Sequence, residues 1–190
     1  MKKLIGLTGK TGSGKSSAAK IFEELGVFCV DCDSVAHEVL QYDEVKKALV
    51  RTFSDVILDE NGNVDRKALG GIVFSDSERL TVLNSIVHSA ILKRCFELCE
   101  NSGCDICLID GSELESSGAD KRCDVMVVVK ADDDVRLRRI MARDGIDLET
   151  ALKRMNSQKD YSKEAVVIEN NGDEASLREK ILTIYTGVIK

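Results

Sequence analysis

The sequence predicts an α/β fold in which a five-stranded parallel sheet lies between layers of helices. The first observation is the opening of the chain, where an apolar run, a glycine-rich turn, a helical pattern and a second apolar run follow one another. That order is typical of the βαβ unit, whose right-handed crossover makes two strands parallel. The second observation is that later apolar runs alternate with helical patterns in the same way. The third is that these runs lack polar alternation, which indicates strands covered on both faces.

The N-terminal half is expected to contain two strands and several helices. Residues 3–8 and 27–30 are short apolar runs, which predict strands. The segment between them, 15–25, has apolar residues at helical spacing and stops at Gly26, a common helix terminator. The remaining helical patterns cover 34–53, 65–73 and 76–101.

The C-terminal half repeats the alternation. Strands are expected at 105–110, 125–129 and 166–168, and helices at 132–143, 147–159 and 175–189. Acidic residues open the first of these helices, where negative charge complements the helix dipole. Asp147 is a candidate N-cap for the second.

We expect a single domain of 190 residues that carries an insert and a lid. The core would be formed by 1–33 and 104–190, and the mostly helical insert by about 34–102. A long helical insert between the second and third strands is typical of a substrate-binding subdomain. A lid is expected at about 136–160.

Composition excludes several functional classes. The net charge of −6 argues against nonspecific binding to nucleic acid or to an anionic membrane surface. No apolar run approaches the length of a membrane span or a signal-peptide core, so we expect a cytoplasmic protein. The sequence does not fix the oligomeric state, and we expect a monomer or a weak homo-oligomer.

The segment Gly-x4-Gly-Lys-Ser at 9–16 defines the expected site. It follows a strand and opens a helix, which is the context of the phosphate-binding loop of P-loop proteins, rather than of a turn that binds nothing. Its glycines let backbone N–H groups turn inward, and the helix N-terminus adds a positive dipole. We expect Lys15 to reach the β- and γ-phosphates of ATP and the Ser16 hydroxyl to bind Mg²⁺. The expected ATP-binding residues are Gly9, Thr11, Gly12, Ser13, Gly14, Lys15, Ser16, Ser17 and Arg143.

Asp33 is the candidate general base. It follows the second strand, and ligands of parallel sheets bind at the carboxyl ends of the strands. Asp33 is equally suited to cap the helix that starts at Ser34. The two roles need different side-chain directions, so the sequence leaves both open.

Three arginines form the second candidate feature. Arg136, Arg139 and Arg143 have the spacing i, i+3 and i+7, so they share one helical face. One interpretation is a solvated face whose charges pair with the acidic residues at 132–134. Because the segment follows a phosphate loop and four strands, we favour a lid whose arginines close over ATP and stabilise the transferring charge.

The chain has seven cysteines. Four of them form two pairs with the Cys-x-x-Cys spacing of zinc ligands, Cys29/Cys32 and Cys104/Cys107. Both pairs lie in strand-like runs, where residues three apart point to opposite faces of the sheet. An odd cysteine count also disfavours a disulfide framework. We therefore expect small buried residues rather than a metal site.

Several motifs together carry a resemblance to a known family. They are the segment 6–16, Asp31-Cys32-Asp33, Gly62-Asn63-Val64-Asp65-Arg66, Leu83-Asn84-Ser85-Ile86-Val87-His88, Arg139, Arg143-Asp144-Gly145, Arg154 with Gln158, and Asn170-Asn171-Gly172. Over nearly its whole length the chain resembles the dephospho-coenzyme A kinases, which have Asp-Ala-Asp where this chain has Asp-Cys-Asp. The resemblance implies transfer of phosphate from ATP, with Mg²⁺, to the ribose 3′-hydroxyl of dephospho-CoA.

The resemblance also implies residue roles. Asp33 would be the catalytic base, and Lys15 and Arg139 would act at the phosphates. Arg66 and His88 would line the acceptor side, where Asp110 at the end of the third strand is also expected. Without the resemblance, His88 has no role that its apolar surroundings suggest.

The chain departs from the family pattern mainly on the acceptor side. The family usually has a proline where this chain has Ser89, and often a glutamine where it has Arg136. Its Ala-Asp is replaced by Glu164-Ala165, and its Pro-Leu-Leu-Phe-Glu by the segment 111–116. Two alternatives therefore stay open: a small-molecule or nucleoside-monophosphate kinase with a diverged acceptor pocket, and an inactive nucleotide-binding homologue. A GTPase switch is disfavoured because 156–160 does not form the Asn-Lys-x-Asp motif that reads guanine.

Overall fold

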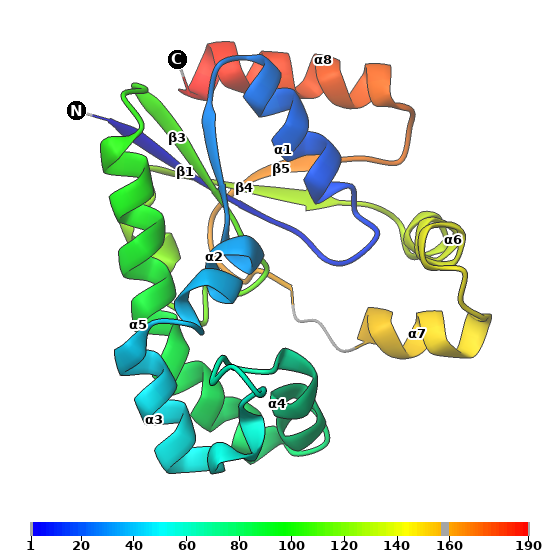
Figure 1. Cartoon of the computed structure of the whole chain (residues 1–190). Helices are drawn as coiled ribbons and strands as arrows, with labels where there is room; N and C mark the ends of the chain where they lie inside the picture. The colour runs from blue at the N-terminus through cyan, green and yellow to red at the C-terminus, as the bar shows by residue number, and fades with distance from the viewer. Residues whose placement is uncertain (1, 157–159, 190) are drawn as a thin grey trace. The chain divides into compact units, whose positions relative to one another are not determined.

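The structure is a computed structural model that describes residues 2–156 and 160–189. The chain divides into two compact units, one formed by Met1–Val30 with Cys99–Lys190 and the other by Asp31–Leu98. Figure 1 shows the course of the chain through both units. The expected insert at about 34–102 and its role in binding the acceptor stay predictions.

The first unit is built on one five-stranded sheet with the strand order β2-β3-β1-β4-β5. Strand β1 pairs in parallel with β3 and β4, and β4 pairs in parallel with β5. The predicted α/β fold on a parallel sheet is therefore confirmed. The strands are β1 Lys3–Thr8, β2 Phe28–Asp31, β3 Ile106–Asp110, β4 Val125–Lys130 and β5 Val166–Glu169.

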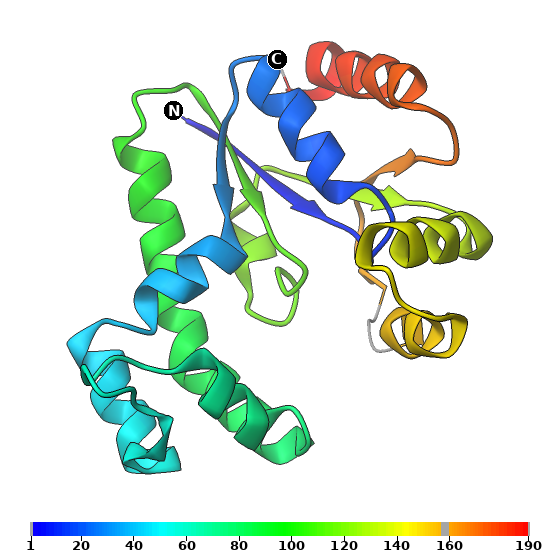
Figure 2. The same ribbon diagram turned by 45° about the vertical axis from the view of Figure 1, so that its right-hand side comes forward.

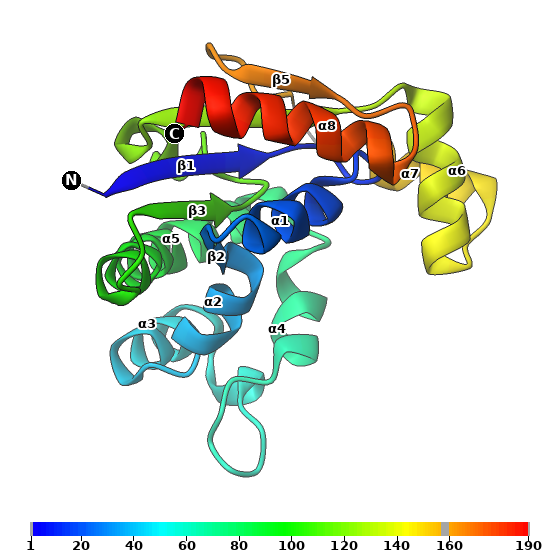
Figure 3. The same cartoon turned by 90° about the horizontal axis from the view of Figure 1, so that it is seen from above.

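Helices α1 (Lys15–Glu24) and α8 (Glu174–Ile184) pack on the same core as the strands. They lie side by side in Figure 3. Phe22 of α1 and Ile181 of α8 are completely buried against the apolar residues of β1, β3, β4 and β5. This packing fixes the start of α1, and with it the loop that joins β1 to α1.

Helices α6 (Asp133–Asp144) and α7 (Leu148–Asn156) lie next to each other (Figure 2) and share a small core around Ile140. The predicted N-cap is confirmed, because the Asp147 carboxylate accepts the N–H of Thr150 at 2.8 Å. Gln158, which belongs to the family resemblance, and Lys159, the expected end of this helix, lie outside the described residues.

The second unit is helical and has its own core, which includes the fully buried Leu49 and Ile57. It contains α2 (Cys32–Val39), α3 (Asp43–Phe53), η1 (Asp55–Ile57), α4 (Arg66–Val73) and most of α5 (Ser77–Asn101). The prediction of one helical stretch over 34–53 is wrong. Helix α2 ends at Val39, and the extended Tyr42 (φ −67°, ψ 135°) is the N-cap of α3, whose acidic first turn favours a new helix N-terminus.

Other segments also differ from the prediction. Helix α8 ends at Ile184 and is followed by a π-helical turn, η3 (Tyr185–Ile189), which contains the helix-weakening Gly187. A short 3₁₀ segment, η2 (Ala119–Arg122), had no sequence signal. None of the described helices is both long enough and apolar enough to cross a membrane.

The expectation that both members of each Cys-x-x-Cys pair lie in strands is wrong. Cys29 and Cys107 are strand residues, but Cys32 opens α2 and Cys104 precedes β3. The strand-based argument against chelation therefore does not hold for either pair. Among the described residues, no group of three or more His, Cys, Asp or Glu side chains forms a candidate metal cluster.

Candidate active site

The loop between β1 and α1 has the backbone that the glycine pattern predicts. Gly12 and Gly14 have φ values of +79° and +93°, in the left-handed region that disfavours side chains. A Cβ on Gly9 would lie 2.5 Å from the Val129 carbonyl oxygen, and a Cβ on Gly14 would overlap the Asn170 amide. Glycine is thus required by backbone torsion and by close packing. A helix that begins at such a loop directs its first N–H groups toward a bound phosphate.

Lys15, the first residue of α1, forms an ion pair with Asp110 at the end of β3. The pair is largely buried, with side-chain exposures of 19% for Lys15 and 9% for Asp110. The two meet because β1 and β3 are neighbours and Leu7, just before the loop, is in register with Asp110. The structure therefore brings Asp110, which was expected on the acceptor side, to the lysine of the phosphate loop. Ser16 and Ser17 follow in the first turn of α1 and are exposed.

Arg139 of α6 is held by backbone carbonyls of two loops. Its Nη1 donates to Asn170 O at 2.9 Å and, at 3.4 Å, to Ser13 O, while Nη2 donates to Gly172 O at 3.2 Å. The buried Asn170 amide also donates to Ser13 O at 2.8 Å. Arg139 and Asn170 thus join the phosphate loop to the segment that follows β5. The sequence pointed to Arg139 through the arginine face and the family resemblance, and to Asn170 through the resemblance alone, and it gave no sign that they meet.

The three arginines of α6 have different surroundings. Arg136 is 5% exposed, and its Nε donates to Thr11 O at 3.0 Å while Nη1 pairs with Asp133 at 2.7 Å. Arg143 is exposed and pairs with Asp144 at 2.7 Å, and this hydrogen bond raises the pKa of Arg143. Arg136 and Arg139 therefore contact the phosphate loop, whereas Arg143 pairs with its neighbour in the chain.

A cavity of about 750 Å³ lies beside the phosphate loop within the first unit. Among the described residues, the Ser13 hydroxyl and Arg136 Nη2 line it and are buried without a hydrogen-bond partner. Lys10 pairs there with Asp160 at 2.7 Å, and this hydrogen bond lowers the pKa of the Asp160 carboxyl. Buried polar atoms are ordinarily hydrogen-bonded, so these two unpartnered donors mark this wall of the cavity as a candidate contact for ligand oxygen atoms. The sequence gave no signal for this arrangement, because Lys10 and Asp160 are 150 positions apart.

The segment after β3 supplies another part of the lining, through Ser112, Glu113, Glu115 and Ser116. Glu115 accepts the backbone N–H of Ser162 at 3.0 Å as well as its hydroxyl, and these hydrogen bonds lower the pKa of the Glu115 carboxyl. The stretch in which this chain departs most from the family pattern thus forms a wall of the cavity.

The remaining site residues lie in the second unit. The Asp31 carboxylate accepts the N–H groups of Asp33 at 3.0 Å and Ser34 at 3.3 Å, so Asp31 is the N-cap of α2. The interpretation of Asp33 as that cap is wrong. Asp33 is exposed in the first turn of α2, Arg66 is exposed at the start of α4, and His88 is half-buried in α5.

Comparison with known proteins gives one consistent result. A sequence model of the family "Dephospho-CoA kinase" matches residues 3–176. The dephospho-CoA kinase of Fusobacterium nucleatum is 40% identical over 182 residues, which are 94% of each chain. That of Carboxydothermus hydrogenoformans is 37% identical and covers 95% of this chain and 92% of its own.

Solved structures agree with the sequence comparison. The structure of TT1252 from Thermus thermophilus superposes with a TM-score of 0.84 at 28% identity, covering 100% of this chain and 98% of its own. The dephospho-CoA kinase of Campylobacter jejuni gives a TM-score of 0.68 at 25% identity, covering 99% and 98%. With the phosphate loop, its lysine and the α6 arginine in place, these matches over the full length leave one conclusion. The chain belongs to the dephospho-CoA kinase family.

Proposed function

We propose that this protein transfers the γ-phosphoryl group of ATP to the ribose 3′-hydroxyl of dephospho-CoA, which yields CoA and ADP. The observation that carries the proposal is the phosphate loop itself, which combines the left-handed Gly12 and Gly14 with Lys15 and is contacted by Arg139 through Ser13 O. The relatives at 37–40% identity, all named dephospho-CoA kinase, support the choice of acceptor.

The donor side is built to balance phosphate charge. The backbone N–H groups of the loop and the N-terminus of α1 receive the phosphate oxygens of ATP. Lys15, now paired with Asp110, is the cation that turns to the β- and γ-phosphates when ATP binds. Arg139 adds a second cation at the loop and stabilises the charge that spreads over the transferring group.

Mg²⁺ fits the residues at the start of α1. The Ser16 hydroxyl is exposed beside Lys15, and it is a hard oxygen donor of the kind that Mg²⁺ prefers. In this role Ser16 would hold the ion together with phosphate oxygens of ATP. When bound, Mg²⁺ neutralises charge on the β- and γ-phosphates.

The acceptor side requires a base and a binding pocket. Asp33 is suited to be the base because its carboxylate is exposed and the capping role next to it belongs to Asp31. The 3′-hydroxyl oxygen attacks the γ-phosphorus, the bond to ADP breaks, and the hydroxyl proton passes to the Asp33 carboxylate. Arg66 and His88 are proposed to bind the acceptor, and Arg136 and Ser13 offer oxygen-binding donors in the cavity.

The proposal extends to the rest of the predicted organisation. Helices α6 and α7 are the proposed lid, Arg143 the arginine that it would bring to ATP, and the second unit the acceptor-binding insert. We place the activity in the cytoplasm, where both substrates are soluble, and expect a monomer or a weak homo-oligomer.

A second candidate acceptor class has one observation in its favour. The wall of the cavity formed by Ser112 to Ser116 departs from the family pattern, which suits a different small-molecule acceptor. The test is a panel of acceptors, namely dephospho-CoA, nucleoside monophosphates and adenosine, each assayed for ADP release with ATP and Mg²⁺. We expect acceptor-dependent ADP release with dephospho-CoA, and ³¹P NMR of the product should show a new phosphomonoester on the ribose. Faster release with another acceptor would refute the assignment.

A further inference from the structure

Two cysteines in the second unit have their sulfur atoms in contact. Cys32 is the first residue of α2 and is half-buried, and Cys95 in α5 is completely buried. Their Sγ atoms are 3.8 Å apart, the distance of an S–H···S hydrogen bond. The residues are 63 positions apart in the sequence, so this contact is made by the fold.

The surroundings make the two sulfurs unequal. The hydrogen bond from Cys32 lowers the pKa of the Cys95 thiol, and Arg94 acts in the same direction, while burial and Asp31 oppose it. The net effect is a Cys95 thiol whose pKa lies below its ordinary value although its side chain is buried. Cys32 is the more accessible sulfur, at a helix N-terminus where the backbone dipoles favour negative charge on a thiol.

We propose that Cys32 and Cys95 form an oxidisable dithiol, which hydrogen peroxide converts to a disulfide. In the first step the Cys32 thiolate attacks one peroxide oxygen, the O–O bond breaks, and Cys32 becomes a sulfenic acid as hydroxide leaves. In the second step the Cys95 thiolate attacks the Cys32 sulfur, the S–S bond forms and a second hydroxide leaves. With the two thiol protons, the products are one disulfide and two water molecules, and the dithiol has lost two electrons.

Two of the other cysteines, Cys29 and Cys123, are expected to react slowly with peroxide. Burial raises the pKa of both Cys29 and Cys123 to about 12, so these thiols stay protonated near neutral pH. A protonated thiol is a poor nucleophile toward peroxide. Cys29 is also three positions from Cys32, which makes it a matched control.

The disulfide would act on the residue next to Cys32. Forming the disulfide shortens the separation of the sulfurs from 3.8 Å to about 2.05 Å, and we expect the first turn of α2 to shift with Cys32. Asp33 lies in that first turn of α2. A displacement of about 1 Å in a catalytic group can cost about 10²-fold in rate. This consequence rests on the proposed role of Asp33, whereas formation of the disulfide does not.

The first arm of the test maps the bond. Purified protein is treated with hydrogen peroxide, remaining thiols are blocked with iodoacetamide, and tryptic peptides are analysed by mass spectrometry. Trypsin leaves Cys32 together with Cys29 in peptide 21–46, and Cys95 together with Cys99, Cys104 and Cys107 in peptide 95–121, so variants are needed to assign the link. We expect the two peptides to be cross-linked in the wild type and in Cys29→Ala, and separate in Cys32→Ala and Cys95→Ser. Absence of the link in the wild type, or its persistence in Cys32→Ala, overturns the proposal.

The second arm measures turnover. We expect peroxide to lower CoA formation by about 10- to 100-fold in the wild type and in Cys29→Ala, with recovery on adding dithiothreitol. Cys32→Ala, which carries the residue usual in the family, should keep its activity after the same treatment. A mapped disulfide with unchanged turnover overturns the coupling to Asp33. If the reduced protein forms no CoA, the proposed function fails, while the mapping arm still decides whether the dithiol is oxidised.

Discussion

Replacing Gly14 with alanine tests the most constrained position of the phosphate loop. Its φ of +93° is a torsion that costs a residue with a Cβ about 1–2 kcal/mol. The new Cβ would also overlap the Asn170 amide, which is buried and bonded to Ser13 O at 2.8 Å. Moving that amide away breaks its hydrogen bond, which contributes about 1 kcal/mol. The combined cost is roughly 2–3 kcal/mol.

If the loop keeps its shape in Gly14→Ala, this free-energy cost lowers the free energy of unfolding. If the loop relaxes to another shape, the cost appears instead as weaker binding of ADP. Urea unfolding and calorimetric titration with ADP together measure both, and we expect their sum to reach about 2–3 kcal/mol for Gly14→Ala. The control is Gly71→Ala, because Gly71 lies within α4 and a Cβ there meets no atom within 4 Å. Unchanged stability and unchanged affinity in Gly14→Ala would refute the reasoning.

A double variant separates the two parts of that cost. Asn170→Ala removes the side chain that the new Cβ overlaps, so Gly14→Ala should cost less in its presence than in the wild-type chain. The remaining cost is then the torsion alone, about 1–2 kcal/mol. Strict additivity of the two substitutions would show that Gly14 and Asn170 do not meet as described.

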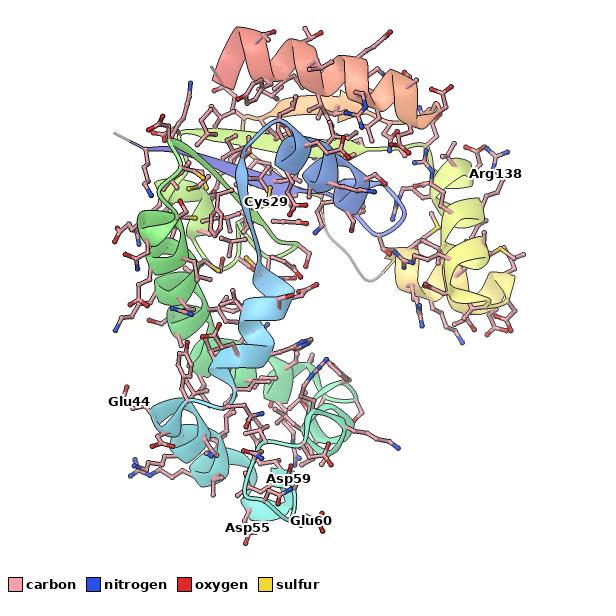
Figure 4. The ribbon with its side chains drawn as sticks, turned by 45° about the horizontal axis from the view of Figure 1, so that its top comes forward. Cys29, Glu44, Asp55, Asp59, Glu60 and Arg138 are labelled. Atoms are coloured by element: carbon pink, nitrogen blue, oxygen red, sulfur yellow. The ribbon has the colours of Figure 1, made fainter. Side chains whose placement is uncertain are left out.

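Three further predictions follow from the site. Asp33→Asn should abolish turnover while ATP affinity, measured by calorimetry, stays near that of the wild type, and retained turnover would remove Asp33 from the role of base. Arg139→Lys should weaken ADP binding and lower kcat, because a lysine cannot donate to both Asn170 O and Gly172 O as the guanidinium does. The control is Arg138→Lys on the exposed side of α6 (Figure 4), which should change neither quantity. Because the pKa values of Cys29 and Cys123 are about 12, roughly one molecule in 10⁴ carries each thiolate at pH 8, so alkylation by iodoacetamide should be slow and rise about tenfold per pH unit. Rapid labelling of either cysteine at pH 8, followed by mass spectrometry, would contradict that prediction.

The strands and the phosphate loop were predictable because their signals are local. An apolar run such as 125–129 must be buried on both faces, and the glycines of the loop mark backbone torsions that other residues avoid. The break in the helix at 40–42 was missed because the residues there carry no proline or glycine. Apolar spacing continues across that break, so the periodic pattern did not reveal it.

The part of the site that depends on tertiary contacts was not predictable. Asn170 bonds to Ser13 across 157 positions, and no pattern in either segment indicates that partner. The role of Asp33 was ambiguous because two acidic residues flank Cys32, and only the hydrogen bonds of Asp31 show which of them caps α2. Arg136 was grouped with Arg139 and Arg143 by helical spacing, which did not indicate that it is buried or that it donates to Thr11 O.

Formation of CoA is the measurement that tests the central claim most directly. Purified protein is mixed with ATP, Mg²⁺ and dephospho-CoA, and CoA and ADP are quantified over time by chromatography, with Lys15→Ala as the variant that removes the loop cation. We predict equal amounts of CoA and ADP in the wild type and a loss of turnover in Lys15→Ala. ATP binding without any CoA, or ADP release that does not depend on dephospho-CoA, would contradict the account.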